Sequence, residues 1–411
     1  MCSMTETHVL IGAGVAAARA AEALRGAGAE GRIVLVGEER DLPYERPELS
    51  KGFLAGKTQR AELTVHDADW YAAHDVEPML GRRAVSIDRE AATVELDGGE
   101  RLPYTRLLLT TGSAPRKLGV PGNDLDGVLY LRRVGNSEAI REAIAAGGPF
   151  VVVGGGWIGL EVGAVARSAG LDVTLLEAGP APLAGPLGEQ VGGLIAGLHR
   201  DHGVDLRTGV QVSELVGDGR VEGVRLADGT VLPAAAVVVG VGIRPRTELA
   251  ADAGLPVDDG VLVDATLRTE DPRIWAAGDV ANAVNDWVGH RLRVEHFANA
   301  NDQGPFVGRS MAGSTEHWAR PPFFWSDQYD AGMEYRGWAD PRTAPLVLRG
   351  GPEDGQWIAF WLGDGDRVSA GLHVNAWDDA DAVKSLVTDR APIDRARLAD
   401  PKTPLEAART L

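Results

Sequence analysis

Two stretches of this chain share one local pattern, in which a short apolar strand runs into a glycine turn, a helix and a second strand. The first stretch covers His8–Val36 and turns at Gly12, and the second covers Phe150–Leu176 and turns at Gly154. The two turns start 142 positions apart (154 minus 12), which is much too far for a solenoid period. The pattern is therefore a duplicated βαβ unit, and it predicts an α/β fold with two Rossmann-like domains.

The first turn, Gly12-x-Gly14-x-x-Ala17, has the spacing of a dinucleotide-binding loop. In such a loop the first glycine makes a tight turn, the second lets backbone N–H groups approach a pyrophosphate, and a small third residue packs helix against strand. Glu38 follows the second strand, where a carboxylate can accept hydrogen bonds from an adenosine ribose. Such turns also occur for packing alone, but the flanking strand, helix and acid favour nucleotide binding here.

The second turn, Gly154-x-Gly156-x-x-Gly159, is the fuller form of the same loop, and Glu177 closes the strand that follows it. A 2′-phosphate beside Glu177 would meet a like charge, and no Arg or Lys lies between positions 178 and 190 to compensate. The sequence therefore predicts NADH in preference to NADPH. The alternative is that Glu177 only caps a loop.

The segment Thr269–Asp279 (TEDPRIWAAGD) indicates which nucleotide belongs to which loop. A short strand that ends in Gly278-Asp279 allows close approach of a flavin's ribityl chain and pyrophosphate, and Asp279 can accept a hydrogen bond from a ribityl hydroxyl. The alternative is a turn after a buried strand. We expect FAD at the first loop and NAD at the second.

Charge and cysteine content exclude several classes of protein. The net charge of -18 argues against general nucleic-acid binding, which needs a basic surface. The only cysteine is Cys2, so the chain holds no internal disulfide, no CxxC redox pair and no cysteine-ligated cluster, and we predict no metal site. No apolar run reaches about 18 residues, and no signal-peptide pattern opens the sequence, so we expect a cytoplasmic protein without membrane contact.

The remaining sequence suggests how the domains are connected. Thr110-Thr111-Gly112 and the turn Gly240–Gly242 are each followed by a proline, and both look like passages from one domain to another. From Trp318 onward the chain holds six of its 10 tryptophans, which predicts an aromatic-rich third domain with β character.

Together these motifs resemble the two-dinucleotide flavoprotein disulfide reductase superfamily. Within it, Pro43–Lys51 (PYERPELSK), Ile158–Glu161 (IGLE) and Phe324–Tyr329 (FWSDQY) are similar to the ferredoxin reductases of bacterial oxygenase systems, and the likeness covers nearly the whole chain. It implies an FAD domain at 1–112 plus 244–318, an NAD domain at 113–243 and a C-terminal α+β interface domain at 319–411.

The resemblance also implies site residues. The positions expected to contact FAD are Gly12, Gly14, Ala16, Ala17, Glu38, Arg46, Lys51, Ala84, Thr111, Gly112, Arg132, Gly278, Asp279 and Phe297. Those expected to contact NAD are Gly154, Gly156, Ile158, Gly159, Glu177 and Gly242. Lys51 is expected near the reactive edge of the flavin, paired with Glu161, where a cation stabilises incoming electron density. Trp325 is expected to cover the flavin edge or to border the path to the partner, or else to be packed core.

The implied reaction passes a hydride from NADH to FAD and then single electrons to a ferredoxin that feeds an oxygenase. Five arginines are candidate contacts for an acidic ferredoxin, although each is equally explained as a solvated surface charge: Arg132, Arg133, Arg291, Arg293 and Arg309. The alternatives are an NADH oxidase, a quinone or radical reductase with the same flavin core, or an NADH-sensing flavoprotein. We expect a monomer or a weak homodimer.

The sequence departs from this family at two places. Relatives commonly carry arginines after the acid equivalent to Glu177, whereas positions 178–185 here read AGPAPLAG. We therefore expect the adenosine part of NADH to be bound more weakly or by a different arrangement of residues. Thr110 stands where an alanine is usual, and we expect little mechanistic effect. The helix expected to open at Asn299–Gln303 would direct its N–H groups at the flavin, and His296 beside it receives no role.

Overall fold

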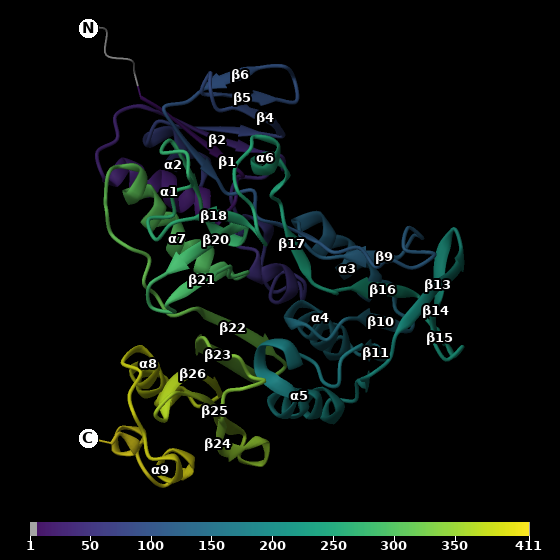
Figure 1. Cartoon of the computed structure of the whole chain (residues 1–411). Helices are drawn as coiled ribbons and strands as arrows, with labels where there is room; N and C mark the ends of the chain where they lie inside the picture. Colours follow the sequence, from purple (N-terminus) through teal and green to yellow (C-terminus); the bar gives the residue numbers. More distant parts are fainter. Residues whose placement is uncertain (1–5, 411) are drawn as a thin grey trace, which may run out of the picture. The chain divides into compact units, whose positions relative to one another are not determined.

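A computed structural model describes residues 6–410, so Cys2 lies outside the described residues. The chain forms two compact units, each built from separate stretches of sequence (Figure 1). The first unit contains residues up to 45 together with 60–114 and 243–322, and the second contains 46–59, 115–242 and 323 onward.

A five-stranded parallel sheet forms the centre of the first unit, in the order β19-β7-β1-β2-β3. These strands span Thr7–Ile11 (β1), Arg32–Gly37 (β2), Val76–Leu80 (β3), Arg106–Leu109 (β7) and Ile274–Ala276 (β19). Strands β1 and β2 are buried along nearly their whole length, and all their buried residues except His8 are apolar, as expected for a sheet covered on both faces. Helix α1 (Val15–Gly26) joins β1 to β2, so the first predicted βαβ unit is confirmed.

Smaller elements complete the first unit. Two three-stranded sheets have the orders β4-β5-β6 and β18-β20-β21. Their strands span Ala84–Asp88 (β4), Thr93–Leu96 (β5), Arg101–Pro103 (β6), Val261–Val263 (β18), Ala281–Asn285 (β20) and His290–Leu292 (β21). The helices span Ala68–Ala73 (α2), Glu248–Asp252 (α6) and Phe297–Met311 (α7), and short 3-10 turns span Arg60–Leu63 (η2) and Gly278–Val280 (η3).

The second unit repeats the parallel arrangement, with the strand order β12-β11-β10-β16-β9. Its strands span Val128–Tyr130 (β9), Phe150–Val153 (β10), Val173–Leu176 (β11), Asp205–Arg207 (β12) and Ala236–Val239 (β16). Helices α3 (Val134–Ala146), α4 (Trp157–Ser168) and α5 (Ala184–Asp201) belong to it, as does an antiparallel sheet of β13 (Val212–Asp218), β14 (Arg220–Leu226) and β15 (Val231–Pro233). The second predicted βαβ unit is therefore also confirmed.

An antiparallel sheet with the order β22-β23-β26-β25-β24 follows in the same unit. Its strands span Phe323–Gln328 (β22), Ala331–Gly337 (β23), Leu346–Gly351 (β24), Gln356–Gly363 (β25) and Arg367–Val374 (β26), and helices α8 (Ala380–Thr388) and α9 (Arg395–Ala399) come after it. Trp357 and Trp361 are buried in the apolar core that this sheet shares with β10 and α5. This confirms the predicted α+β character of the C-terminal part.

The chain passes between the units after residues 45, 59, 114, 242 and 322. Two of these passages lie at the short strands β8 (Ser113–Pro115) and β17 (Ile243–Pro245). Each strand directly follows one of the two predicted glycine turns and ends in the proline noted after it. The sequence did not indicate that residues 46–59, which include the 3-10 turn η1 (Pro47–Ser50), pack with the second unit. The division into three domains stays a prediction.

Candidate active site

Most of the residues expected to bind FAD gather at one edge of the first unit's parallel sheet. Gly12 follows β1, Glu38 follows β2, Thr111 follows β7 and Gly278 follows β19. Because these four strands are parallel, their carboxyl ends meet at the same edge, which is where open α/β sheets bind ligands. Four of the expected residues lie elsewhere. Ala84 begins β4 in a separate small sheet, and Arg46, Lys51 and Arg132 belong to the second unit.

The loop after β1 fits a dinucleotide. Gly12 has φ 111°, and a Cβ there would lie 2.2 Å from the carbonyl oxygen of Thr110, so only glycine fits this turn. At Gly14, the N-cap of α1, a Cβ would meet nothing within 4 Å, which leaves space in front of the first N–H groups of the helix. A tight turn followed by an open helix N-terminus is what a pyrophosphate requires.

Thr110 contributes more to this loop than the sequence suggested. Its hydroxyl is within hydrogen-bonding distance of two carbonyl oxygens, 3.0 Å from that of Ile11 and 2.9 Å from that of Gly12. The side chain is nearly fully buried. Thr110 therefore ties the end of β7 to the start of the glycine turn, which the usual alanine could not do.

Gly278 and Asp279 lie directly after β19, in the 3-10 turn η3. Gly278 has φ 76°, and its N–H donates to the side-chain oxygen of Gln303 on α7 at 2.8 Å. A Cβ on Gly278 would sit only 3.6 Å from that of Ala16, so this turn lies against the first glycine loop. The structure brings the two motifs together, as their predicted shared ligand requires.

Helices α1 and α7 approach each other through small side chains. A Cβ at Gly304 would lie 2.8 Å from the carbonyl oxygen of Ala16, and one at Gly308 would lie 2.6 Å from that of Ala20. Ala17 on α1 is fully buried. Phe297, the first residue of α7, packs on a small cluster formed by Val15, Ala16 and Ala300.

Helix α7 starts at Phe297, two residues before the position expected from the sequence. The earlier start follows from His296, whose Nδ1 accepts a hydrogen bond from the backbone N–H of Ala298 and caps the helix.

Glu38, the expected ribose acid, is not isolated at the sheet edge. Its carboxylate lies 3.0 Å from the guanidinium of Arg246. The backbone of Arg246 in turn accepts from the Thr111 hydroxyl at 2.8 Å and donates to the carbonyl oxygen of Gly112 at 2.9 Å. Arg246, which the sequence analysis did not single out, therefore links three of the predicted FAD residues.

The second unit has an equivalent loop at the carboxyl end of β10. Gly154 has φ 109°, and a Cβ there would lie 2.4 Å from the carbonyl oxygen of Gly240. A Cβ on Gly159 would lie 2.0 Å from the carbonyl oxygen of Gly154, so helix α4 packs directly on the turn. Gly156 is the N-cap of α4, and Gly242, with φ 97°, lies in the neighbouring turn after β16.

Ile158 is unusual in this loop because it is a large apolar residue that is 43% exposed, in the first turn of α4. Exposure of one such side chain beside a nucleotide-type loop is consistent with a ligand covering it.

Glu177 follows β11 and is held by the loop beside it. Its two oxygens accept hydrogen bonds from the backbone N–H groups of Gly155 and Gly179, both at 2.6 Å. The carboxylate thus caps a loop, as the alternative interpretation proposed, and it also stands directly against the glycine turn. Both carboxylate oxygens keep a further lone pair with which to accept from a ribose hydroxyl.

Lys51 and Glu161 form a buried ion pair in the second unit. The Lys51 ammonium lies 2.5 Å from a Glu161 oxygen, and the two side chains are 12% and 4% exposed. Glu161 also accepts from the hydroxyls of Ser50, at 2.5 Å, and Ser326, at 2.6 Å. A buried carboxylate needs several donors of this kind to offset the loss of its hydration.

The other predicted residues of the second unit lie elsewhere in it. A side-chain N–H of Arg46 donates to the backbone carbonyl of Arg132 at 2.5 Å, so these two positions are adjacent. Trp325 lies in the middle of β22, with its ring stacked at 6.1 Å on that of Phe323.

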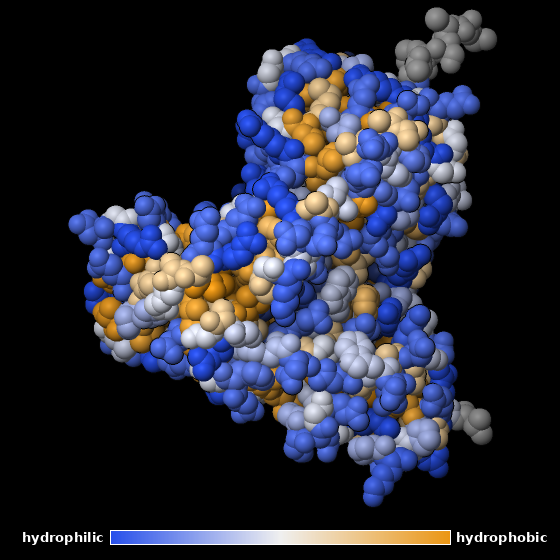
Figure 2. Space-filling view, turned by 180° about the vertical axis from the view of Figure 1, so that it is seen from behind, coloured by the Kyte–Doolittle hydropathy of each residue, from blue (hydrophilic) through white to orange (hydrophobic). Residues whose placement is uncertain are grey.

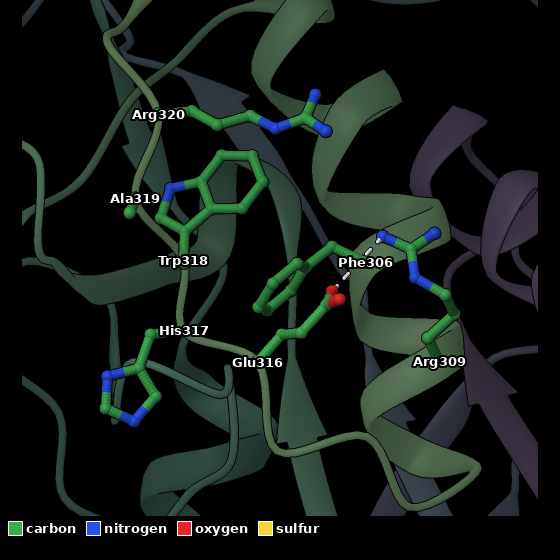
Figure 3. A pocket seen from close by; sticks show the side chains of 7 residues that line it. All are labelled: Phe306, Arg309, Glu316, His317, Trp318, Ala319 and Arg320. Carbon is green, nitrogen blue, oxygen red and sulfur yellow. Dashed lines mark ion pairs between the residues drawn. The ribbon is translucent and has the colours of Figure 1, made fainter.

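A hollow of about 250 Å³ occurs in the first unit, lined by α7 and the segment after it (Figure 3). Its lining residues are Phe306, Arg309, Glu316, His317, Trp318, Ala319 and Arg320. None of the predicted FAD residues lines this hollow. Arg309, one of the five candidate docking arginines, is half-exposed there and only 3.9 Å from Glu316 (Figure 3).

Comparison with known families decides the class of this protein. Residues 6–304 match the pyridine nucleotide-disulphide oxidoreductase family, and residues 323–409 match a reductase C-terminal family. The chain belongs to the pyridine nucleotide-disulphide oxidoreductase family. The predicted oxidoreductase class and the use of FAD and NAD(H) are thereby confirmed.

Relatives within this family cover nearly the whole chain. Rhodocoxin reductase from Rhodococcus erythropolis is 38% identical over 97% of this chain and 93% of its own length. The ferredoxin–NAD(+) reductase component of the anthranilate 1,2-dioxygenase system from Burkholderia cepacia is 38% identical over 98% of each. Among solved structures, the reductase of the covalent putidaredoxin reductase–putidaredoxin complex superposes with a TM-score of 0.94 at 36% identity, covering 98% of this chain and 99% of that chain.

Among residues 6–410, no helix combines the length and apolar character needed to cross a bilayer. The face shown in Figure 2 is mainly hydrophilic, with smaller apolar areas between the polar residues.

Proposed function

We propose that this protein is a ferredoxin–NAD(+) reductase that takes electrons from NADH and delivers them one at a time to a small iron-sulfur ferredoxin of an oxygenase system. The observation that carries this proposal is the full-length likeness, at 36–38% identity, to proteins named as ferredoxin–NAD(+) reductase components of dioxygenase systems. The solved covalent complex of putidaredoxin reductase with putidaredoxin supports the choice of a ferredoxin as acceptor.

FAD, when bound, supplies the conversion between the two-electron chemistry of NADH and the one-electron chemistry of an iron-sulfur cluster. The first unit's contribution is binding and orientation. The open N-terminus of α1 at Gly14 offers N–H groups to a pyrophosphate, and Glu38, fixed by Arg246, accepts from the ribose. Asp279, held in place by the turn that Gln303 fixes, accepts from the ribityl chain.

Lys51 supplies a fixed positive charge. Its side chain is only 12% exposed and has Glu161 as its counter-ion, so moving the ammonium into water would leave a buried carboxylate without that counter-ion. A charge fixed in advance stabilises electron density without reorganisation at the moment of reaction. This role for Lys51 is supported by the resemblance in Pro43–Lys51 and by the rigidity of the pair.

The acid Glu177 selects NADH. Its carboxylate is held by two backbone N–H groups and stands beside the glycine turn, so a 2′-phosphate would meet it at close range. We expect turnover with NADH to exceed turnover with NADPH. Replacing Glu177 by Gln should raise the NADPH-to-NADH ratio of kcat/KM by about tenfold, the change that ~1.4 kcal/mol of charge repulsion produces.

Steady-state kinetics with both nucleotides measure this ratio. Glu189→Gln is the matched control, because Glu189 is an exposed acid on α5, and it should leave the ratio unchanged. A wild-type protein that prefers NADPH would contradict the assignment of Glu177.

The proposed ferredoxin contact includes Arg309. Its side chain is 43% exposed at the hollow of Figure 3 and lies near Glu316. Arg320, which is 55% exposed and paired with Asp302, adds a second cation there. Arg293 suits docking less well, because its side chain is 9% exposed and is paired with Asp259 and Glu295. Arg291 likewise donates to the backbone carbonyls of Val263 and Asn282.

Reconstitution tests the function directly. The flavoprotein, NADH and cytochrome c are mixed with or without a candidate ferredoxin, and cytochrome c reduction is followed. We expect rapid reduction only when the ferredoxin is present. Equal rates without ferredoxin would point to a quinone or radical reductase. Rapid oxygen consumption would point to an NADH oxidase, and slow turnover with tight NADH binding would point to a sensor.

We further propose a cytoplasmic location and a monomeric or weakly dimeric state.

A further inference from the structure

A continuous row of hydrogen-bonded side chains extends from Glu161 through the second unit. The Ser326 hydroxyl is 2.6 Å from Glu161, and the Gln328 amide nitrogen is 3.1 Å from Ser326. The other end of the Gln328 amide is 2.8 Å from Nε2 of His199, and the Tyr329 hydroxyl is 3.2 Å from Nδ1 of that histidine. Three of these four side chains, those of Ser326, Gln328 and His199, are almost completely buried.

The carboxylate at one end fixes the direction of every hydrogen bond in this row. An ionised carboxylate only accepts, so Ser326 must donate its single proton to Glu161. The Ser326 oxygen then accepts from the amide N–H of Gln328, which turns the amide oxygen of Gln328 toward His199. A carbonyl oxygen at 2.8 Å requires an N–H partner, so Nε2 of His199 carries the proton.

The tautomer of His199 also fixes the direction of the hydrogen bond between this histidine and Tyr329. Burial lowers the pKa of His199 to about 4, so the ring is neutral near pH 7 and its Nδ1 is an acceptor. The Tyr329 hydroxyl therefore donates to Nδ1. All four hydrogen bonds, from Tyr329 to His199, Gln328, Ser326 and Glu161, point the same way, and aligned bonds of this kind polarise one another.

The outer end of the row is also constrained. Tyr329 has φ 57°, and its ring is stacked on that of His202 with 3.7 Å between centroids. His202 follows α5, and its Nδ1 is 2.8 Å from the carbonyl oxygen of Leu198. The row thus joins α4, β22 and the end of α5, and it ends on the carboxylate that holds Lys51.

We propose that Ser326, Gln328, His199 and Tyr329 are positioning residues that hold Glu161, and through it the ammonium of Lys51, in one orientation, and that they thereby tune the reduction potential of the bound flavin. This inference rests on the proposed function, because it takes Lys51 to act on the flavin. None of the four residues needs to contact the flavin. A packing role alone would leave the flavin potential unchanged when the hydrogen bonds are removed.

The test measures the midpoint potential of the bound flavin by dye titration of the purified holoprotein, without NADH or ferredoxin. Ser326→Ala, Gln328→Met and Tyr329→Phe remove successive links while keeping side-chain size nearly constant. We expect a shift in the same direction as that of Lys51→Met, largest for Ser326→Ala and smallest for Tyr329→Phe. In a Lys51→Met background the three changes should produce no further shift.

Two outcomes of this titration separate the inference from the function on which it rests. If Lys51→Met shifts the potential and Ser326→Ala and Gln328→Met do not, the positioning role is overturned while the proposed function stands. If the protein binds no flavin, or if Lys51→Met leaves the potential unchanged, the proposed site fails and the inference fails with it.

A measurement on the unaltered protein guards against variants that do not fold. Nitrogen NMR of the full chain labelled in its histidine rings reports the tautomer of each ring, and His199→Gln assigns the signal. A neutral His199 with its proton on Nε2 is expected at pH 7. A proton on Nδ1 would reverse the order of donors and overturn the proposal.

Discussion

At the residue scale, the feature that most affects both stability and activity is the ion pair of Lys51 and Glu161. Both side chains are largely buried, and removal of one member of such a pair leaves an uncompensated charge. Lys51→Met should lower the free energy of unfolding by about 3 kcal/mol. It should also slow reduction of the bound flavin by NADH.

Thermal unfolding and stopped-flow absorbance measure the two effects of Lys51→Met. Lys57→Met provides the control, since Lys57 is an exposed lysine of the same short segment. Reduction kinetics equal to those of the wild type would remove Lys51 from the mechanism.

His199 gives a pH dependence whose sign follows from its burial. Its pKa is about 4 in the folded protein, against about 6.5 when unfolded, because burial disfavours the charged ring and the neighbouring His202 adds to the effect. Above about pH 6.5 the ring is neutral in both states and contributes no pH dependence. Between about pH 6.5 and 4 the unfolded chain binds the proton more readily, so up to about 3 kcal/mol of stability is lost.

Unfolding midpoints recorded across this pH range should therefore fall less steeply for His199→Gln than for the wild type. The groups facing His199 are Gln328 in β22, Tyr329 directly after that strand, and His202, which directly follows α5. His290→Gln, at an exposed histidine, should leave the slope unchanged. Equal slopes for the wild type and His199→Gln would contradict the assignment.

At the scale of elements, the close packing of α7 on α1 links two parts of the proposed FAD site. A methyl group at Gly304 would lie 2.6 Å from Cβ of Arg19 and 2.8 Å from the carbonyl oxygen of Ala16. Gly304→Ala should therefore force the helices apart, cost about 1–3 kcal/mol and move Gln303 away from the N–H of Gly278. We expect weaker retention of FAD.

The flavin content of Gly304→Ala after desalting, read from its visible absorbance, tests this expectation. Gly26→Ala is the matched control on α1, because a Cβ there meets nothing within 4 Å. It should leave flavin content unchanged and should slightly raise helix stability. If Gly304→Ala retained FAD as well as the control does, the coupling between the two helices would be disproved.

Elements formed by local sequence patterns were predictable, whereas contacts between distant residues were not. The two strand-turn-helix units and the aromatic-rich sheet follow from spacing and composition, because turns and buried strands have strong local requirements. The pairing of Glu38 with Arg246, and of His199 with Gln328, joins positions more than 100 residues apart. No local pattern marks such an arginine or histidine, although Ser326 and Gln328 lie within a motif that the sequence analysis had identified.

At the scale of the whole molecule, the net charge of -18 affects the rate at which the protein meets its proposed partner, an acidic ferredoxin. Two acidic proteins repel each other at long range, while the cations near Arg309 attract only at short range. The Debye length falls from about 30 Å at 0.01 M salt to about 10 Å at 0.1 M and about 3 Å at 1 M, so moderate salt screens the repulsion first. The rate of ferredoxin reduction should therefore rise and then fall as ionic strength increases.

Stopped-flow reduction of the ferredoxin over this range of salt concentration measures the profile. Arg309→Glu should lower the rate most at moderate salt, where the local attraction dominates. Reduction of a small neutral acceptor serves as the control and should be nearly independent of salt. A rate that falls steadily from the lowest salt concentration would show that attraction dominates at every distance.

Residues 46–59 pack with the second unit although they interrupt the sequence of the first. In that unit, Lys51 and Ser50 meet Glu161 of the glycine-loop helix and Ser326 of the C-terminal sheet. A chimera made by exchanging only residues 115–242 between two reductases would thus combine Glu161 from one parent with partners from the other. Recombination that keeps this cluster intact must transfer three separate gene segments together, namely those that encode Lys51, Glu161 and Ser326. The part of the gene that has to be exchanged as a whole is therefore discontinuous.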